Sequence, residues 1–384
     1  MYKSCKIRIY PTQEQRAIIW RHIGACRFVW NYMLAWQQEE YKKGNHKLVS
    51  SNEMSSMLPK MKKTEEFGWL KDISSQSLQM VCKNVAYAYM QFFRGTAGYP
   101  KFKTKKKSFP SYPLAYEPFR FENGTVMVAK TGKIKVKTDY DFIYKNNLKT
   151  SNMRIMYENN KWFLSFSYEC ETQALELTEN PMGIDLGVKE LATVAFGGKC
   201  EIYHNINKAK KMRNLDKQAK AYLKSINRKY RHSQANNDGK WIKTNNIIKL
   251  EEKLRKILHR KTNIRKDYIH QTTKALVKQA PSVVTMENLD ISAMLKNKHL
   301  RTAIGEAGMK MFINQMRYKC EYYEVPFIQA PKFYPSSKLC SRCGNIKSNL
   351  KLSDRTYYCR NCRLQINRDY NAALNLMMYG THLK

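Results

Sequence analysis

The sequence is poor in acidic residues and has no long hydrophobic run. Its 384 residues include 31 Asp and Glu against 69 Lys and Arg, a formal net charge of +38. A surplus of this size repels itself in a compact fold and favours a polyanionic partner, since counterion release from phosphates drives binding. No apolar run approaches the roughly 18–20 residues of a membrane-spanning helix. Because the basic residues are spread over the whole chain, nucleic acid is favoured over a membrane surface.

Two further absences restrict the function. No apolar segment follows residues 1–6, so no signal peptide is expected and the protein is predicted to be cytoplasmic. None of the eight histidines stands in a His-x-His triplet, the metal-binding pattern of the small tyrosine transposases, which argues against a DNA-joining transposase. The length of the chain and its 43% apolar content predict two or three domains.

The cysteines fall into two groups. Six are isolated and are predicted to be small buried apolar residues, namely Cys5, Cys26, Cys82, Cys170, Cys200 and Cys320. The other four form two Cys-x-x-Cys pairs separated by 15 residues, and these are Cys340, Cys343, Cys359 and Cys362. Two such turns can close a tetrahedral site of four thiolates, so the spacing predicts one structural zinc ion. Disulfides or unused thiols are the alternative, which an intracellular setting disfavours.

The N-terminal part combines a short strand with helices. The expected elements are a strand at 6–10 and helices at about 12–41 and 74–93. Thr12 and Gln15 form a capping-box pattern at the start of the first helix. Residues 43–73 between the helices are interpreted as irregular and partly helical. Residues 11–111 are therefore predicted to form a helical domain.

Basic and aromatic residues alternate over residues 99–109. In such a segment lysines can contact phosphates while Phe or Tyr rings stack on bases or ribose. The lysines expected to contact nucleic acid here are Lys101, Lys103, Lys105 and Lys106. The alternative is a solvated loop whose aromatic residues anchor it to the core.

Strand patterns and turn signals alternate over residues 112–180. Strands are expected at 120–122, 125–129, 133–136, 153–158 and 161–168. Asn123-Gly124, Thr131-Gly132 and Asn159-Asn160 predict turns between several of them. Together with residues 1–10, these strands could close a small β-barrel. The helical domain would then be an insertion after the first strand of that barrel.

The pattern changes again after Pro181. The expected elements are strands at 182–188, 191–196 and 200–204, Lys- and Arg-rich helices over 207–280 with a break near 233–239, a strand at 282–286, a helix at about 302–324, a strand at 326–330 and a helix at 371–379. This order is that of an RNase H-like fold, in which three antiparallel strands are followed by parallel ones. The predicted core comprises residues 181–338 plus 364–384, and the cysteine module at 339–363 is inserted into it.

Three acidic residues attract attention because an acid embedded in an apolar strand is costly unless it has a function. Asp185 lies among apolar residues and glycines in the first of these strands, Glu287 follows the strand at 282–286, and Asp369 lies where the last helix starts. In an RNase H-like sheet the two strand ends are neighbours, and a terminal helix can bring the third carboxylate over them. Three converging carboxylates can bind two Mg²⁺ about 3.5–4 Å apart.

Each of these acids also has a structural interpretation. Asp185 could serve in a turn or an ion pair, Glu287 could simply end a strand, and Asp369 could cap a helix. Asp290, three residues after Glu287, is a rival ligand that falls in the following loop. The joint placement of the three acids on three expected elements is what favours catalysis.

Several short segments together carry a family resemblance. They are Arg8–Thr12, Cys26–Asn31, Gly183–Val188, Glu287–Leu289, Pro335–Cys340, Leu352–Arg355 and Arg368–Ala373. Over about residues 3–378 the chain resembles the TnpB (OrfB) proteins of insertion sequences, the ancestors of the compact type V CRISPR nucleases. Two positions depart from that family: Arg363 replaces a glycine after the fourth cysteine, and Asn367 replaces an acid found in many relatives. Neither position is catalytic, so activity should survive.

The resemblance implies an RNA-guided DNA endonuclease with a RuvC-like core of RNase H type, a wedge-type β-barrel and a helical recognition domain. It implies a guide RNA derived from the transposon end and a double-stranded DNA target beside a short motif. In that pattern Asp185, Glu287 and Asp369 are the catalytic acids that bind magnesium, and the four paired cysteines hold zinc in an inserted ribbon. One chain with one RNA, associated with the nucleoid of a bacterium or archaeon, is the expected form.

The resemblance also suggests how the nucleic acids are held. The basic helices over 207–280 are expected to line the channel of the RNA–DNA heteroduplex. Gln79 is expected to touch the motif beside the target, although a solvent-facing helix residue is the alternative. Three other functions remain open: a compact type V CRISPR effector, a non-cleaving RNA-guided repressor and a zinc-ribbon nucleic-acid-binding protein. The intact acids oppose the second, and Asp185 in its apolar strand is unexplained by the third.

Overall fold

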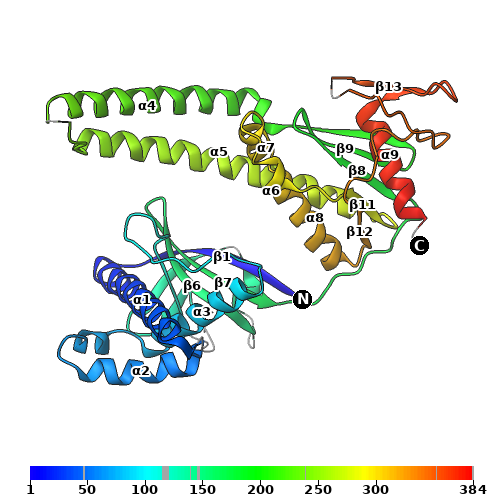
Figure 1. Ribbon diagram of the computed structural model, residues 1–384. Helices are drawn as coiled ribbons and strands as arrows, with labels where there is room; N and C mark the ends of the chain where they lie inside the picture. The colour runs from blue at the N-terminus through cyan, green and yellow to red at the C-terminus, as the bar shows by residue number, and fades with distance from the viewer. Residues whose placement is uncertain are drawn as a thin grey trace. The chain divides into compact units, whose positions relative to one another are not determined.

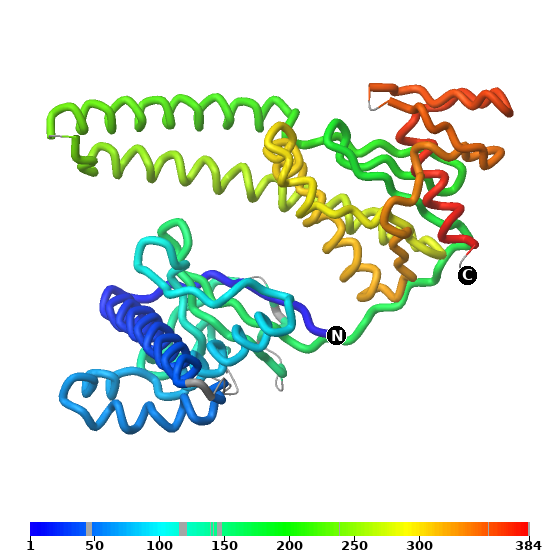
Figure 2. The backbone as a smooth tube through the Cα atoms, in the orientation of Figure 1, coloured from blue at the N-terminus to red at the C-terminus, as the bar shows by residue number. Residues whose placement is uncertain are grey.

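The computed structural model describes residues 1–45, 48–114, 121–138, 140–144, 148–237, 239–351 and 353–382 (Figure 1). Arg120, the first residue of an expected strand, and Leu352, part of one family segment, lie outside these ranges. The chain divides into two compact units, Met1–Cys170 and Glu171–Lys384, whose backbone is traced in Figure 2. No helix in the described ranges is long and apolar enough to cross a membrane.

The first unit contains a seven-stranded antiparallel sheet. Its strands are β1 (Tyr2–Tyr10), β2 (Ser111–Pro113), β3 (Phe121–Glu122), β4 (Thr125–Val128), β5 (Gly132–Lys137), β6 (Thr150–Glu158) and β7 (Lys161–Glu169). Their order is β2-β6-β7-β1-β5-β4-β3, so the first strand of the chain lies at the centre. No described residues pair β2 with β3, and closure of this sheet into a barrel stays a prediction.

The turns of this sheet are where the sequence indicates them. Asn159 and Asn160 have φ of 49° and 60°, and they join β6 to β7 in a two-residue hairpin. Asn123 and Gly124 repeat this pattern between β3 and β4, with φ of 48° and 69°. Two successive left-handed residues match the twist of a hairpin, and Asn and Gly tolerate that conformation best.

The helices of the first unit follow β1. They are α1 (Gln13–Glu40), α2 (Ser51–Lys63) and α3 (Ser75–Phe93), with short turns η1 (Tyr41–Asn45), η2 (Gly68–Asp72) and η3 (Asp141–Tyr144). The capping box at Thr12 and Gln15 is present, which confirms that prediction. A second capping box, at Ser50 and Glu53, starts α2 in a segment that was predicted to be irregular and partly helical.

The second unit contains a five-stranded mixed sheet. Its strands are β8 (Met182–Leu186), β9 (Glu190–Phe196), β10 (Lys199–His204), β11 (Val284–Glu287) and β12 (Phe327–Ala330). The order is β10-β9-β8-β11-β12; the first three are mutually antiparallel, and β11 is parallel to both β8 and β12. The expected RNase H-like strand order is therefore present.

Helices cover this sheet and extend from it. They are α4 (Lys210–Ala235), α5 (Asn245–Lys278), α6 (Ile291–Met294), α7 (Arg301–Ala307), α8 (Met309–Tyr323) and α9 (Arg368–Thr381), with η4 (Ile206–Lys208) before α4. The long helices α4 and α5 run side by side as a two-helix arm (Figure 1). The prediction of a single helix at about 302–324 is wrong. Gly308, in a left-handed conformation with φ of 75°, separates two helices, α7 and α8.

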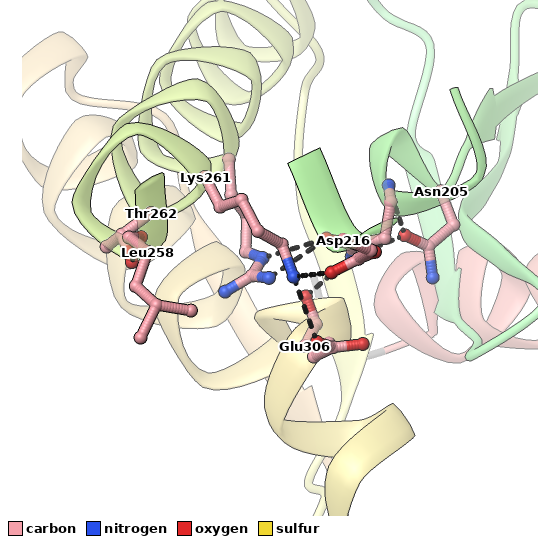
Figure 3. A network of polar contacts seen from close by, with 8 residues as sticks. Asn205, Asp216, Leu258, Lys261, Thr262 and Glu306 are labelled. Atoms are coloured by element: carbon pink, nitrogen blue, oxygen red, sulfur yellow. Dashed lines mark hydrogen bonds and ion pairs between the residues drawn. The ribbon is translucent and has the colours of Figure 1, made fainter. Parts of the chain in front are cut away.

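An ion-pair network fixes the arm to the rest of its unit. Figure 3 shows Lys261 of α5 between Asp216 of α4 and Glu306 of α7, with 3.5 Å from its Nζ to the Glu306 carboxylate. Lys261 is 7% exposed, and Arg265 on the next turn donates to Asn207 at 2.9 Å. A buried charge that loses its partner costs about 3–5 kcal/mol, so this network holds three helices in one arrangement.

Candidate functional site: a four-cysteine cluster and three carboxylates

The four paired cysteines form one cluster. Their sulfur atoms all lie within 4.8 Å of one another; the Cys340 and Cys362 sulfurs are 3.5 Å apart, and those of Cys343 and Cys359 are 3.6 Å apart. These separations are far longer than the roughly 2.05 Å of a disulfide. They are close to the distances between sulfurs around a tetrahedral ion with bonds of about 2.3 Å. The cluster is compatible with a zinc site.

Each knuckle turns through one left-handed residue. Gly344 has φ of 71°, and Arg363 occupies the matching position of the second knuckle with φ of 58°. A residue other than glycine in this conformation costs about 1–2 kcal/mol. The departure at Arg363 therefore leaves the turn intact. Two short strands that the sequence did not reveal, β13 (Thr356–Tyr358) and β14 (Gln365–Asn367), pair around the second knuckle.

Two buried asparagines fix the cysteine module to α9. Asn371 accepts the Ser341 amide hydrogen at 3.0 Å and donates to the Leu339 carbonyl at 2.6 Å. One turn later, Asn375 donates to the carbonyls of Ser336 and Leu339. Sequence reasoning missed both as functional residues. The available signal was a pair of amides four residues apart on one face of an otherwise apolar helix.

Replacing Cys340 and Cys343 together with serine should reduce bound zinc from about one ion per chain to near none and lower the melting temperature, since two knuckle ligands are lost. Metal analysis and thermal unfolding measure both effects. The matched control changes the isolated Cys170 and Cys200, which lie outside the cluster, and should retain full zinc. Parent protein purified without zinc, yet equally stable after zinc is added, would contradict a structural metal.

The two strand-borne acids lie on the same face of the sheet. Parallel pairing places Met286 of β11 opposite Ile184 of β8, and both are fully buried in the core shared with α5 and α8. Successive side chains of a strand point to opposite faces. Asp185 and Glu287, the next residue of each strand, therefore face the other side, at neighbouring strand ends roughly 4.8 Å apart. Gly183 shares that side.

Helix α9 brings the third acid to this face. It packs across β8, β9 and β11 (Figure 1), and a side-chain carbon on Gly183 would lie 2.0 Å from the Ala373 carbonyl oxygen and 2.5 Å from the Met377 nitrogen. Only glycine permits so close an approach of helix and strand. Asp369 lies one turn before Ala373, in the first turn of α9. The helix thus starts close to the end of β8 that carries Asp185.

The pKa of Asp185 is affected by the two neighbouring acids. Burial, the Asp369 charge and the Glu287 charge raise the pKa of Asp185 from 3.8 to about 8, while Arg368 opposes the shift. Burial also raises the pKa of Glu287. The guanidinium of Arg368 lies 3.2 Å from the Asp369 carboxylate. A carboxylate at Asp185 that is disfavoured by burial and by two neighbouring acids suits a divalent cation, which would neutralise it.

The donor set indicates which cations could bind. All three side chains offer only oxygen and are half-buried, so they remain accessible to ions and substrate. Oxygen-only carboxylate sites suit Mg²⁺, Ca²⁺ or Mn²⁺. Within the described ranges, only the cysteines bring their ligand atoms within 4.8 Å of one another, so the carboxylates are more widely spread.

The rival ligand Asp290 has a structural role. Its carboxylate accepts the Ala293 amide hydrogen at 2.9 Å, which caps α6, and lies 3.1 Å from the Lys332 ammonium. The Ala293 hydrogen bond, together with Lys332, lowers the pKa of Asp290. The side chain is exposed and already occupied, so the ranking of Asp290 below the other three acids agrees with its position.

Two of the lysines expected to contact nucleic acid line a cavity of about 760 Å³ in the first unit. Lys103 lies 3.4 Å above the Trp30 ring, and burial together with the charge of Arg154 lowers its pKa to about 8. Asn31 holds the Lys103 backbone through hydrogen bonds of 2.7 and 2.9 Å. Lys105 lines the same cavity. Two lysines, one of them above an indole ring, form an environment that suits an anionic, aromatic ligand.

The other expected contacts are more dispersed. The Lys101 carbonyl accepts the Trp30 indole hydrogen at 3.1 Å, while the residue itself is exposed. Lys106 is exposed in the same loop, and Gln79 is exposed on α3. None of these three lines the cavity. Both interpretations of this segment therefore have support, since it is anchored to α1 and also presents cations.

The sheet order, with acids at two neighbouring strand ends and at the start of α9, defines an RNase H-like protein. Three family models match parts of the chain: a helix-turn-helix domain of the OrfB group at residues 1–46, its "Probable transposase" domain at 165–298, and a Cas12f1-like TNB domain at 310–376. The first match covers β1 and the single long helix α1. These matches support a place for the chain in the TnpB (OrfB) family.

Curated relatives span nearly all of the chain. A protein of Streptomyces pristinaespiralis named as a candidate RNA-guided DNA endonuclease is 29% identical, over 98% of this chain and 89% of that protein. InsQ of Escherichia coli K12, named in the same way, is 28% identical over 98% and 92%. A solved complex of Cas12f1 with guide RNA and target DNA has a TM-score of 0.63 at 14% identity, covering 98% of both chains, which supports the fold.

Proposed function

We propose that this protein is an RNA-guided DNA endonuclease of an insertion sequence. The main support is that Asp185, Glu287 and Asp369, which are far apart in the chain, lie on one face of the RNase H-like sheet. The relatives named as RNA-guided DNA endonucleases support the same activity. A surplus of 38 positive charges supports the two nucleic-acid partners.

Asp185, Glu287 and Asp369 are proposed to hold two magnesium ions, which when bound activate water and stabilise the leaving oxygen of a phosphodiester. The chain supplies the rest of the site. The packing of α9 on Gly183 fixes the spacing of the carboxylates, and Arg368 orients Asp369. Deprotonated Asp185 is required, because only the carboxylate binds a cation well. The four cysteines hold one structural zinc ion beside this site.

The wider organisation follows from the charge distribution. Residues 1–10 plus 112–180 are proposed as a wedge-like domain and residues 11–111 as a recognition domain. The core at 181–338 plus 364–384 carries the ribbon at 339–363. The basic arm of α4 and α5 is proposed to follow the RNA–DNA heteroduplex, whose base pairing would read the sequence. One chain is proposed to bind one guide RNA, with Gln79 near the motif beside the target.

A compact type V CRISPR effector is the second candidate. The Cas12f1-like TNB match at residues 310–376 and the TM-score of 0.63 favour it. The chemistry would be the same, so the gene neighbourhood separates the two: a transposon end beside the gene, or a repeat array.

The test is to purify the protein with its RNA, sequence that RNA and supply a matching plasmid with randomised flanks. The proposal expects one discrete RNA that ends at a transposon boundary, and magnesium-dependent cleavage beside one flanking motif. A repressor would bind the plasmid and leave it intact. Heterogeneous RNA with no guided cutting would refute the proposal.

The metal-free protein should become less stable as pH rises. The folded state keeps the Asp185 proton up to pH about 8, whereas the unfolded chain releases it near 3.8. This contribution to stability is full below about pH 4 and is lost as pH rises to about 8. The melting-temperature gain of Asp185→Asn over the parent, measured with chelator, should therefore grow across this window. Magnesium should reverse it; a gain independent of pH would contradict the shift.

A further inference from the structure

The turn after β12 presents a large aromatic side chain to solvent in a strained conformation. Phe333 is 84% exposed and has φ of 70°. A bulky residue in the left-handed region is rare, because its Cβ meets the following carbonyl. Glycine would suit this backbone better, and a polar residue would suit this exposure better. Strain of this kind persists where the surroundings impose it, and it is concentrated at functional sites.

The turn is held from two sides, by the loop that follows Glu287 and by helix α9. On one side Lys332 pairs with Asp290, three residues after Glu287. On the other side the Tyr334 ring packs on Tyr379 of α9 with centroids 4.9 Å apart. The Tyr334 amide donates a hydrogen bond to the Pro331 carbonyl at 3.0 Å, which closes the turn. Phe333 is therefore fixed in place although its own ring has few neighbours.

This position borders the carboxylates. Ala330, the last residue of β12, stands opposite Glu287 in the parallel register, and Glu287 is next to Asp185. Phe333 follows Ala330 by only three residues, beyond the carboxyl end of β12, and the carboxyl ends of β8 and β11 carry the two acids. A DNA strand whose phosphate reaches the carboxylates would pass these strand ends. The Lys332 ammonium, 5.4 Å from the Phe333 ring centroid, is itself paired with Asp290, so the exposed ring is the group left to contact that strand.

We propose that Phe333 is a stacking site for one unpaired nucleobase of the strand that enters the carboxylate site. The proposal rests on the nuclease function proposed above. An aromatic ring accepts any base, because every base has a π-face, so the site would position the strand without reading its sequence. Phe333 is a positioning residue: it holds the nucleotide beside the phosphate to be cut and takes no part in proton transfer.

The test compares parent, Phe333→Trp and Phe333→Gly complexes, each loaded with guide RNA, on short target strands. Glycine removes the ring and fits φ of 70°, so this variant should fold at least as well. We expect Phe333→Gly to raise KM roughly ten- to a hundredfold with little change in kcat, and tryptophan to restore it. A single abasic nucleotide, moved along the target strand, should abolish the KM difference between parent and Phe333→Gly at one position. At that same position, 2-aminopurine fluorescence should be quenched by the parent and not by Phe333→Gly.

The outcomes separate the two proposals. Equal cleavage of intact and abasic strands by parent and Phe333→Gly, with no position-specific quenching, would overturn the stacking site. A glycine variant that changes the oligomeric state would also overturn it, because the ring would then cover a second copy. Failure of the parent to cut any guided DNA would overturn the nuclease function, and 2-aminopurine quenching in the uncut complex would still decide the role of Phe333.

Discussion

Replacing Asp185 with asparagine is expected to abolish cleavage of guide-matched DNA and to leave guide-dependent DNA binding intact. Asparagine keeps the shape of the side chain and removes the carboxylate that interacts with both other acids. Metal ions contribute several kcal/mol to the stabilisation of such transition states, so the cleavage rate should fall by about three orders of magnitude or more. Single-turnover cleavage and a gel-shift assay with the same target measure the two properties.

A matched control separates this loss from a general effect of charge. Asp267 is exposed on α5, where its carboxylate accepts a hydrogen bond from Gln271 at 2.9 Å, outside the carboxylate site. Asp267→Asn makes the same chemical change and should cut at the parent rate. Cleavage by Asp185→Asn within a few-fold of the parent would remove Asp185 from the catalytic set. Loss of DNA binding in that variant would indicate misfolding instead.

Adding one methyl group at Gly183 should disable the site without touching an acid. The new carbon would lie 2.0 Å from the Ala373 carbonyl, a backbone atom that cannot rotate away. Helix α9 would have to move off β8, taking Asp369 with it. Overpacking of this severity should cost about 3 kcal/mol or more, and the melting temperature should fall by roughly 6 °C or more. Magnesium-dependent cleavage should be lost with it.

The control is an alanine where a glycine has room. Gly305 in α7 has only the Leu295 side chain near it, at 3.8 Å, and its φ is ordinary. Gly305→Ala should be neutral or slightly stabilising, because alanine favours a helix over glycine. If Gly183→Ala kept both the parent melting temperature and parent cleavage, α9 would not be seated on β8 as described. The account of how Asp369 is positioned would then fail.

Helix α9 connects the cysteine cluster with the carboxylate site. Its first turn carries Asp369, Ala373 packs on β8, and Asn371 and Asn375 bind the backbone beside the first cysteine pair. Any disorder in the ribbon would therefore reach the helix that positions Asp369, a proposed catalytic acid. If the cluster holds zinc and the carboxylates cut DNA as proposed, loss of zinc should slow cleavage as well as lower stability.

Two acids of this site could be found from the sequence because they conflict with their surroundings, whereas Asp369 sits at a helix start, where an acid is common. Asp185 interrupts an apolar strand, Glu287 ends a buried one, and their neighbourhood follows from the strand order of the RNase H-like fold. The four cysteines were found from spacing alone, since two Cys-x-x-Cys turns leave few alternatives. Local sequence patterns, such as the Asn-Asn and Asn-Gly turns, depend on few neighbouring residues and can therefore be recognised in a single sequence.

Features that depend on tertiary contact were not visible in this way. Asn371 and Asn375 resemble ordinary helix residues until the ribbon backbone is seen beside them. The helix break at Gly308 depends on the packing of Ile269, whose side chain would lie 2.8 Å from an added carbon. The strands β13 and β14 have only three residues each, which is too short for a periodic pattern. The strain at Phe333 is a property of the backbone that its neighbours impose.

The most direct test is anomalous diffraction from crystals of the guide-bound protein soaked in Mn²⁺, which takes the same oxygen ligands as Mg²⁺ and scatters strongly. Two peaks about 3.5–4 Å apart, contacted by the carboxylates of Asp185, Glu287 and Asp369, are the expected result. Both peaks should vanish or weaken in Asp185→Asn. Manganese bound elsewhere, with these three side chains free of metal, would contradict the account.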